Sequence, residues 1–194
     1  METATATAIP SAATAIPSAA TVVPATAAPA TAAPTTAPAL DVRAVPGPVL
    51  DALRRTDDAG RARTAAVTEQ GGEPLRCCLT RARPGERITL LSYAPLLRWA
   101  AETGCDPGPY LETGPVFVHA EPCPGHPGGW PAGFHGGPRV LRAYAADGRI
   151  LGGRLGGPAE LPSLAAELLA DPATAVLHVR AVEFGCFLHE VRRG

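Results

Sequence analysis

The sequence contains no lysine, so all 17 basic side chains are arginines, and they are balanced by 18 acidic residues. The formal net charge of −1 leaves no basic excess of the kind that binds a polyanion. Apolar runs of about 18 residues are also lacking, which excludes a membrane-spanning helix. We therefore expect neither a nucleic acid nor a membrane among the partners, and no other partner can be named.

Cysteines are few, odd in number and irregularly spaced: Cys77, Cys78, Cys105, Cys123 and Cys186. An odd count would leave one thiol unpaired in a disulfide framework, so reduced thiols are the simpler interpretation. A secretory signal is not evident either, because Glu2 is the only early charge and prolines interrupt each apolar run. These features predict a cytoplasmic protein.

Residues 1–39 lack aromatic side chains and consist almost entirely of Ala, Thr, Pro, Ser and Val. The heptapeptide TAIPSAA at Thr7–Ala13 recurs at Thr14–Ala20, but a proline in each repeat is incompatible with a coiled coil. We expect a disordered extension. It could be a tether, a glycosylated stalk or a segment that the native protein does not translate. Residues 40–194 are expected to form one globular domain, long enough to fold without a metal or disulfide.

Short extended segments dominate this domain, and Arg87–Tyr93 and Pro115–Ala120 are the clearest strands. The Asp147-Gly148 turn joins two further strands in a hairpin. Helices are expected over Pro48–Arg55 and Pro162–Ala170, with a long Gly/Pro-rich loop between Tyr93 and Gly114. The predicted class is α+β, with a mostly antiparallel sheet of about six to eight strands and one or two packed helices.

The densest group of reactive side chains lies in GPVFVHAEPCPGH, from Gly114 to His126. In an extended strand His119 and Glu121 point to the same face, where they could exchange protons as a general acid and base. Cys123 would be the nucleophile beside them. These three residues are the catalytic candidates. The alternative is a polar strand end in which His119 bonds to the backbone.

A Cys/His metal site is a further alternative, because Cys123 and His126 have the spacing of a chelating turn. Five other residues could complete it: Cys77, Cys78, His119, Cys186 and His189. Structural zinc sites usually show two well-formed pairs, whereas the adjacent side chains of Cys77 and Cys78 would point to opposite faces of an extended chain. The sequence therefore predicts no metal and no cofactor.

Four residues are candidates for binding a small ligand: Arg76, Cys78, Tyr93 and Cys186. Arginines before and after Cys77-Cys78 could bind a carboxylate or phosphate, although such a run is more often a solvated loop. Cys186 is more often a packed core residue than a ligand-binding one. The glycine-rich segment from Gly152 to Gly157 lacks the Lys-Ser/Thr of a phosphate loop and is expected to be flexible.

Four segments occur in a characteristic order: RCCLTRARPGERITLLSY, GPVFVHAEPC, LRAYAADGRI and LLADPATAVLHVRAVEFGCF. In this respect the chain resembles a bacterial family known as domain of unknown function 1203, from Val42 to Arg192. The resemblance implies a shared fold and no particular activity. Members of that family often carry Cys-x-x-Cys before the Pro-Gly-Glu turn, and Leu75 stands here in place of the first cysteine.

Together these features favour an accessory module that binds a small ligand or a partner near His119, Glu121 and Cys78. The alternative is an enzyme that uses His119 and Glu121 for proton transfer, with a nearby thiol.

Overall fold

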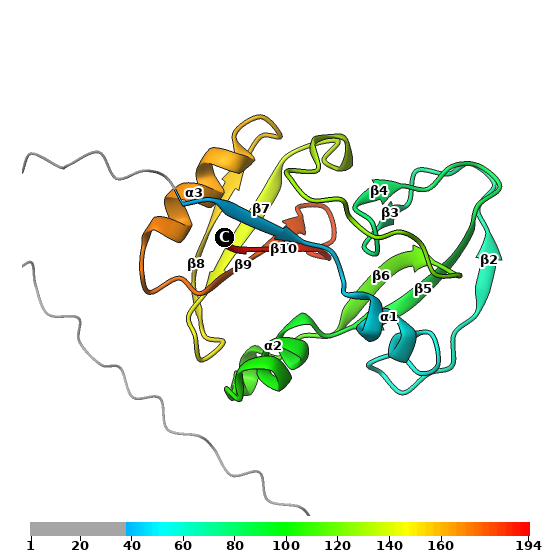
Figure 1. Cartoon of the computed structure of the whole chain (residues 1–194), viewed down its shortest axis with the longest axis horizontal. Coiled ribbons are helices and arrows are strands. Elements are labelled where there is room, and N and C mark those ends of the chain that lie inside the picture. The colour runs from blue at the N-terminus through cyan, green and yellow to red at the C-terminus, as the bar shows by residue number, and fades with distance from the viewer. Residues whose placement is uncertain (1–37) are drawn as a thin grey trace, which may run out of the picture. The chain divides into compact units, whose positions relative to one another are not determined.

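The computed structural model describes residues 38–194, so almost all of the expected disordered extension lies outside the described residues. This part of the chain contains ten strands, which form two five-stranded sheets, and three α-helices (Figure 1). The α+β class and the mostly antiparallel pairing are confirmed, and the strands divide between two sheets instead of forming one.

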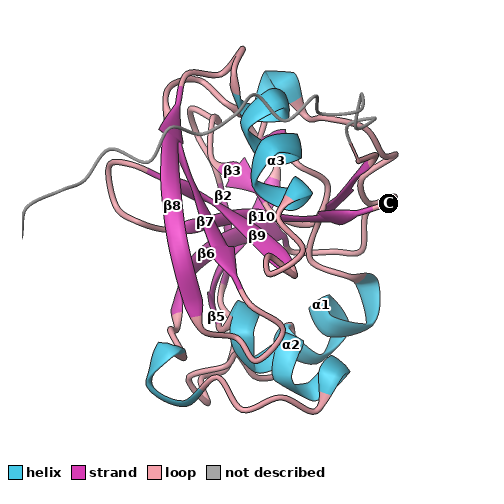
Figure 2. Ribbon diagram, turned by 90° about the vertical axis from the view of Figure 1, so that its left-hand side faces the viewer, coloured by secondary structure: helices cyan, strands magenta, loops and turns pink. Residues whose placement is uncertain are grey.

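The first sheet contains both ends of the described chain. Its strands, in spatial order, are β1 (Leu40–Arg43), β10 (Phe187–Arg193), β9 (Val176–Ala181), β7 (Arg139–Tyr144) and β8 (Ile150–Gly156). All neighbours are antiparallel. Helix α3 (Leu161–Ala170) lies across this sheet, and Leu161, Ala165 and Leu169, one turn apart, supply its buried stripe (Figure 2). Beyond β10, the Gly194 N–H bonds to the Ala39 carbonyl oxygen at 2.9 Å.

The expectation of a flexible glycine segment is wrong, because the stretch as far as Gly156 continues β8. Gly153 pairs with Arg142, and Gly156 pairs with Arg139 of β7. A Cβ atom on Gly156 would collide with the Leu164 side chain of α3. Glycine therefore allows the helix to approach the strand closely.

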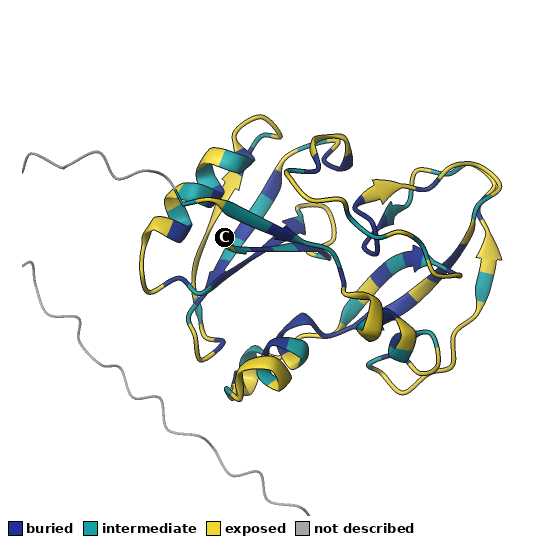
Figure 3. Ribbon diagram, viewed as in Figure 1, coloured by how far each residue is buried: buried dark blue, intermediate teal, exposed yellow. Residues whose placement is uncertain are grey.

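The second sheet contains the Cys77-Cys78 region. Its strands, in spatial order, are β2 (Ala65–Val67), β5 (Arg87–Tyr93), β6 (Gly114–His119), β3 (Pro74–Leu75) and β4 (Thr80–Arg81). Only the β3–β6 pair is parallel among the described strands. Helix α1 (Gly47–Leu53) buries Leu50 and Leu53 in the core of this sheet. Buried residues concentrate on the inner strands of both sheets, and the edge strands β2, β4 and β8 are largely exposed (Figure 3).

Helix α2 (Pro95–Thr103) occupies part of the region that was expected to be a loop. It begins with Pro95 in its first turn, and Gly104, whose φ of 73° is left-handed, caps its C-terminus. The helix buries Leu96 and Trp99. The helix is obscured in the sequence because glycines and prolines crowd the residues that follow it.

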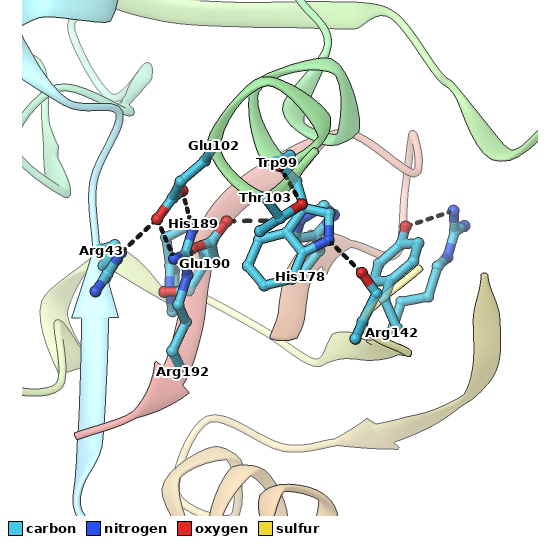
Figure 4. A network of polar contacts seen from close by, with 11 residues as sticks. Arg43, Trp99, Glu102, Thr103, Arg142, His178, His189, Glu190 and Arg192 are labelled. Atoms are coloured by element: carbon cyan, nitrogen blue, oxygen red, sulfur yellow. Dashed lines mark hydrogen bonds and ion pairs between the residues drawn. The ribbon is translucent and has the colours of Figure 1, made fainter. Parts of the chain in front are cut away.

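Arg192 of β10 holds α2 against the first sheet (Figure 4). Its guanidinium donates hydrogen bonds to both carboxylate oxygens of Glu102, at 2.6 and 2.7 Å. It also stacks on the Trp99 ring, 4.6 Å from the centroid, and pairs with Glu190 of its own strand. The contacts between β5 and β10 complete the junction, where the Tyr93 and Phe187 rings lie 5.4 Å apart.

Within residues 38–194, the helices are too short or too polar for any of them to cross a membrane.

Candidate metal centre

Three thiols and one imidazole converge beside the second sheet. The potential ligand atoms of Cys77, Cys78, His119 and Cys123 all lie within 4.8 Å of one another. The two adjacent sulfurs are 3.9 Å apart, and His119 Nδ1 lies 3.3 Å from Cys77 Sγ and 3.8 Å from Cys78 Sγ. This group could hold a metal ion.

A tight turn between β3 and β4 brings the adjacent thiols together. The expectation that they point to opposite faces assumed an extended chain, but Leu79 has a left-handed φ of 56° and donates its N–H to the Leu75 carbonyl oxygen. A left-handed conformation is unfavourable for leucine. The Leu79 side chain is buried in the core of the first sheet, and this packing offsets the backbone strain.

Two arginines hold the end of β6, where His119 lies. Arg54 donates hydrogen bonds to the carbonyl oxygens of His119 and Glu121, and Arg63 donates to that of Ala120. The His119 backbone N–H donates to Cys77 Sγ at 3.3 Å. The imidazole is thus held over the thiol pair by backbone contacts as well as by its own strand.

The Cys77 and Cys78 thiols differ in acidity. The hydrogen bond from Cys77 lowers the pKa of Cys78 to about 5, and the Thr80 hydroxyl, 3.0 Å from Cys78 Sγ, stabilises the same thiolate. That hydrogen bond, together with burial, raises the pKa of Cys77. Cys78 is therefore the more acidic thiol of the pair.

Glu86 is the carboxylate beside the imidazole, with Oε2 3.5 Å from His119 Nε2. The backbone N–H of Arg83 holds the pKa of Glu86 below its ordinary value, and His119 adds to the effect. A proton on Nε2 of His119 would face this carboxylate and leave Nδ1 free to bind a metal.

Glu121 does not occupy the expected place beside His119. Strand β6 ends at His119, so the alternation of a strand no longer governs the residues after it. The Glu121 side chain is exposed and lies 3.5 Å from Arg87. The expected side-by-side pair is therefore not formed, and Glu86 takes the position that Glu121 was expected to hold.

Cys123 joins the group from the Gly/Pro-rich loop after β6, without His126. The His126 ring contacts the Gly129 carbonyl oxygen at 2.9 Å instead. His189 pairs with His135 in the core. A surface hollow of about 470 Å³ is bordered by Cys77 and Cys123, which gives a metal ion a route to the thiols.

The four residues expected to bind a small ligand are distributed over three places. Cys78 belongs to the thiol group. Tyr93 and Cys186 border one hollow of about 380 Å³, and Arg76 and Cys186 border another of about 580 Å³. Arg76 is not part of a solvated loop, because it is buried and donates from Nε to the Phe187 carbonyl oxygen at 2.8 Å.

A family model described as a protein of unknown function, DUF1203, matches residues 72–193. The match begins at residue 72, later than the resemblance from Val42 predicted, and it includes all members of the thiol–imidazole group. No curated protein and no solved structure matches the chain. Because the matched segment spans more than half of the sequence, the chain belongs to the DUF1203 family.

Proposed function

We propose that the protein binds a zinc ion through the sulfurs of Cys77, Cys78 and Cys123 and through Nδ1 of His119. The observation that carries this proposal is the set of distances between the ligand atoms, 3.3 to 3.9 Å for the three pairs given above. Four tetrahedral ligands at zinc's bond lengths of about 2.0–2.3 Å stand roughly 3.4–3.8 Å from one another. Small side-chain adjustments would close the group around the ion.

The chemistry of the donors favours zinc over hard cations. Thiolates and imidazoles bind zinc well, whereas magnesium and calcium require oxygen ligands. The neighbouring polar groups have the geometry that supports such a site. Glu86 would orient the imidazole, while the Thr80 hydroxyl and the His119 N–H would donate to two of the sulfurs.

A site with four protein ligands has no open position for a substrate, so the proposed role of the ion is structural. The ion would connect the β3–β4 turn, the end of β6 and the loop that carries Cys123. All five cysteines are unpaired, in keeping with the reducing cytoplasm that we propose as the location.

The test is the metal content of the purified full-length protein, measured by inductively coupled plasma mass spectrometry. We expect about one zinc ion per chain, and a tetrahedral cobalt–thiolate absorption spectrum when cobalt replaces zinc. The Cys123→Ser variant should lose both the bound zinc and the cobalt–thiolate spectrum. Cys105→Ser is the matched control, since Cys105 is also partly exposed but lies outside the group. A protein that retains no metal and gives no such cobalt spectrum would exclude the proposal, as would equal loss in both variants.

The lowered pKa of Cys78, together with the imidazole 3.8 Å away, favours a thiol enzyme as the second candidate. Cys78 would be the nucleophile, His119 the base, and Glu86 would orient the imidazole. Iodoacetamide labelling of metal-free protein at pH 6, mapped by mass spectrometry, tests this function. If Cys78 is a nucleophile, it should be labelled faster than Cys105. Equal labelling of the two cysteines would exclude the thiol enzyme.

A further inference from the structure

The largest of the hollows described above, about 580 Å³, lies between the two sheets. Residues of β3 to β6 form one wall, and residues of β7, β9 and β10 with the β9–β10 turn form the other. The volume falls within the range of about 300–1,000 Å³ that is typical of small-molecule sites. None of the four proposed zinc ligands lines it.

Positive charge is concentrated in this hollow. Arg76, Arg81 and Arg139 line it, and Glu183 is the only carboxylate among the lining residues. Arg76 and Arg139 are only 3% and 5% exposed. Glu183, which is itself exposed, lies 3.5 Å from Arg139, and within residues 38–194 neither of the other two arginines forms an ion pair.

Backbone carbonyls satisfy only part of this buried charge. Arg76 donates to the carbonyl oxygens of Phe187 and Pro74, but Arg139 Nε is buried without a hydrogen-bond partner. Burying a cation without an anion is costly. Burial lowers the pKa of Arg76 to about 10, and the positive charges of Arg81 and Arg139 add to this effect.

Most of the remaining lining is apolar, and part of it is exposed. Phe184, at the β9–β10 turn, is 86% exposed, and Leu90 of β5 is 53% exposed. Phe117 and Leu188 continue the same surface into the hollow. Exposed apolar side chains beside buried cations are typical of a site that binds a molecule with both kinds of surface.

We propose that this hollow binds a small organic anion with an apolar body. The anionic head would accept hydrogen bonds from the buried guanidinium groups of Arg76 and Arg139, and the body would pack against Leu90 and Phe184. Guanidinium groups bind both carboxylates and phosphates in a fork geometry, so the lining allows either head group. The site is independent of the zinc proposal.

Isothermal titration calorimetry of the full-length protein tests this site with four probes, all used below the concentrations at which micelles form. Decanoate and octyl phosphate combine an anionic head with an alkyl chain. Decyltrimethylammonium reverses the charge, and inorganic phosphate lacks the chain. We expect saturable binding of one or both amphiphilic anions, at least about tenfold tighter than either other probe. Their relative affinities identify the preferred head group.

Matched variants localise the binding. Arg139→Gln and Leu90→Ala should each weaken it, Arg139→Gln by about tenfold or more. Arg149→Gln and Leu155→Ala make the same changes at exposed positions outside the hollow and should leave it intact. If Arg139→Gln fails to fold, Phe184→Ala takes its place and should also weaken binding. The exposed Phe184 side chain contributes little to folding, so this variant should fold. The proposal is overturned if neither anion binds, if a control probe binds equally well, or if the matched variants behave alike. Cys123→Ser should still bind the anion, which separates this site from the metal.

Discussion

At the residue scale, the most unusual feature is a pair of histidines in the hydrophobic core. The Nε2 atoms of His135 and His189 lie 3.0 Å apart, and the Trp130 ring lies within 6 Å of both imidazoles. One ring must donate the shared proton and the other must accept it. If His189 Nδ1 donates to the Glu190 carbonyl oxygen, 3.4 Å away, His135 is the donor of the pair. Both rings are then neutral.

This pair predicts a loss of stability in mild acid. Burial lowers the pKa of His135 to about 4, assisted by Arg139 and Arg81, and lowers that of His189 to about 3. In the unfolded chain both rings have a pKa near 6.5, so unfolded molecules bind protons first as the pH falls. The stabilisation is fully present above about pH 6.5 and is lost progressively towards pH 4, on the order of 3 kcal/mol for His135 alone.

Urea unfolding at several pH values between 7.5 and 4 measures this effect. His135→Asn should flatten the dependence of the unfolding free energy on pH, whereas His126→Asn, at a partly exposed ring, should keep it. The interpretation fails if the two variants show the same slope as the unmodified protein.

The residues of the metal centre were only partly predictable. His119, Cys78 and Cys123 stood out in the sequence, and the structure brings them together. Cys77 was among the possible metal ligands, but its side chain was expected to point away from that of Cys78. The turn that brings the two together contains the left-handed Leu79, which is buried in the core of the other sheet. The contact between Glu86 and His119 depends on the pairing of β5 with β6, which is equally invisible in local sequence.

At the scale of elements, the attachment of α2 depends on Arg192. Its side chain is largely buried between Glu102, Glu190 and the Trp99 ring. Arg192→Ala would leave Glu190 buried without its partner, so we expect a loss of about 2–4 kcal/mol in the free energy of unfolding. Urea denaturation measures it.

Arg154→Ala is the control for this prediction. Arg154 of β8 also forms an ion pair with a helix, with its guanidinium 3.7 Å from the Glu167 carboxylate of α3. Both of these side chains are more than half exposed. Such a pair contributes at most about 0.5–1 kcal/mol. Equal destabilisation by the two substitutions would contradict a special role for Arg192.

The local sequence was sufficient to predict the elements that depend on short-range signals. Strand β5 has the predicted bounds, and the Asp147-Gly148 turn joins β7 and β8 as expected. Strand β8 was underestimated because its glycines are ordered by pairing with β7 and by the approach of α3, which are long-range contacts. Helix α2 is different: Pro95 and Gly104 are ordinary start and stop signals, and they could have been recognised.

At the scale of the whole molecule, the proposed zinc ion would lie where the chain passes from one sheet to the other. Cys123 lies on the loop that leads from β6 to Phe134, which is buried with α3 in the core of the first sheet. The other three ligands belong to the second sheet or its turns. A zinc ion that binds only the folded form would therefore stabilise the whole domain.

Removal of the metal tests this coupling. Dialysis against a strong zinc chelator should lower the thermal unfolding midpoint, since a ligand at 100 times its Kd contributes about 2.7 kcal/mol. Cys123→Ser should start at the lower midpoint and be insensitive to the chelator, and Cys105→Ser should respond like the unmodified protein. A midpoint that the chelator leaves unchanged in metal-loaded protein would show that the ion does not support the fold.

The hydrogen bond between Gly194 and Ala39 places Gly194 against the start of β1. A linker of a few residues could therefore join these two positions without stretching, because closing so short a gap costs little entropy. The domain is thus suited to circular permutation, with the order of β1 and β10 along the chain reversed and both sheets retained. A segment attached after Gly194 would begin beside β1, although β1 lies about 150 residues earlier in the sequence.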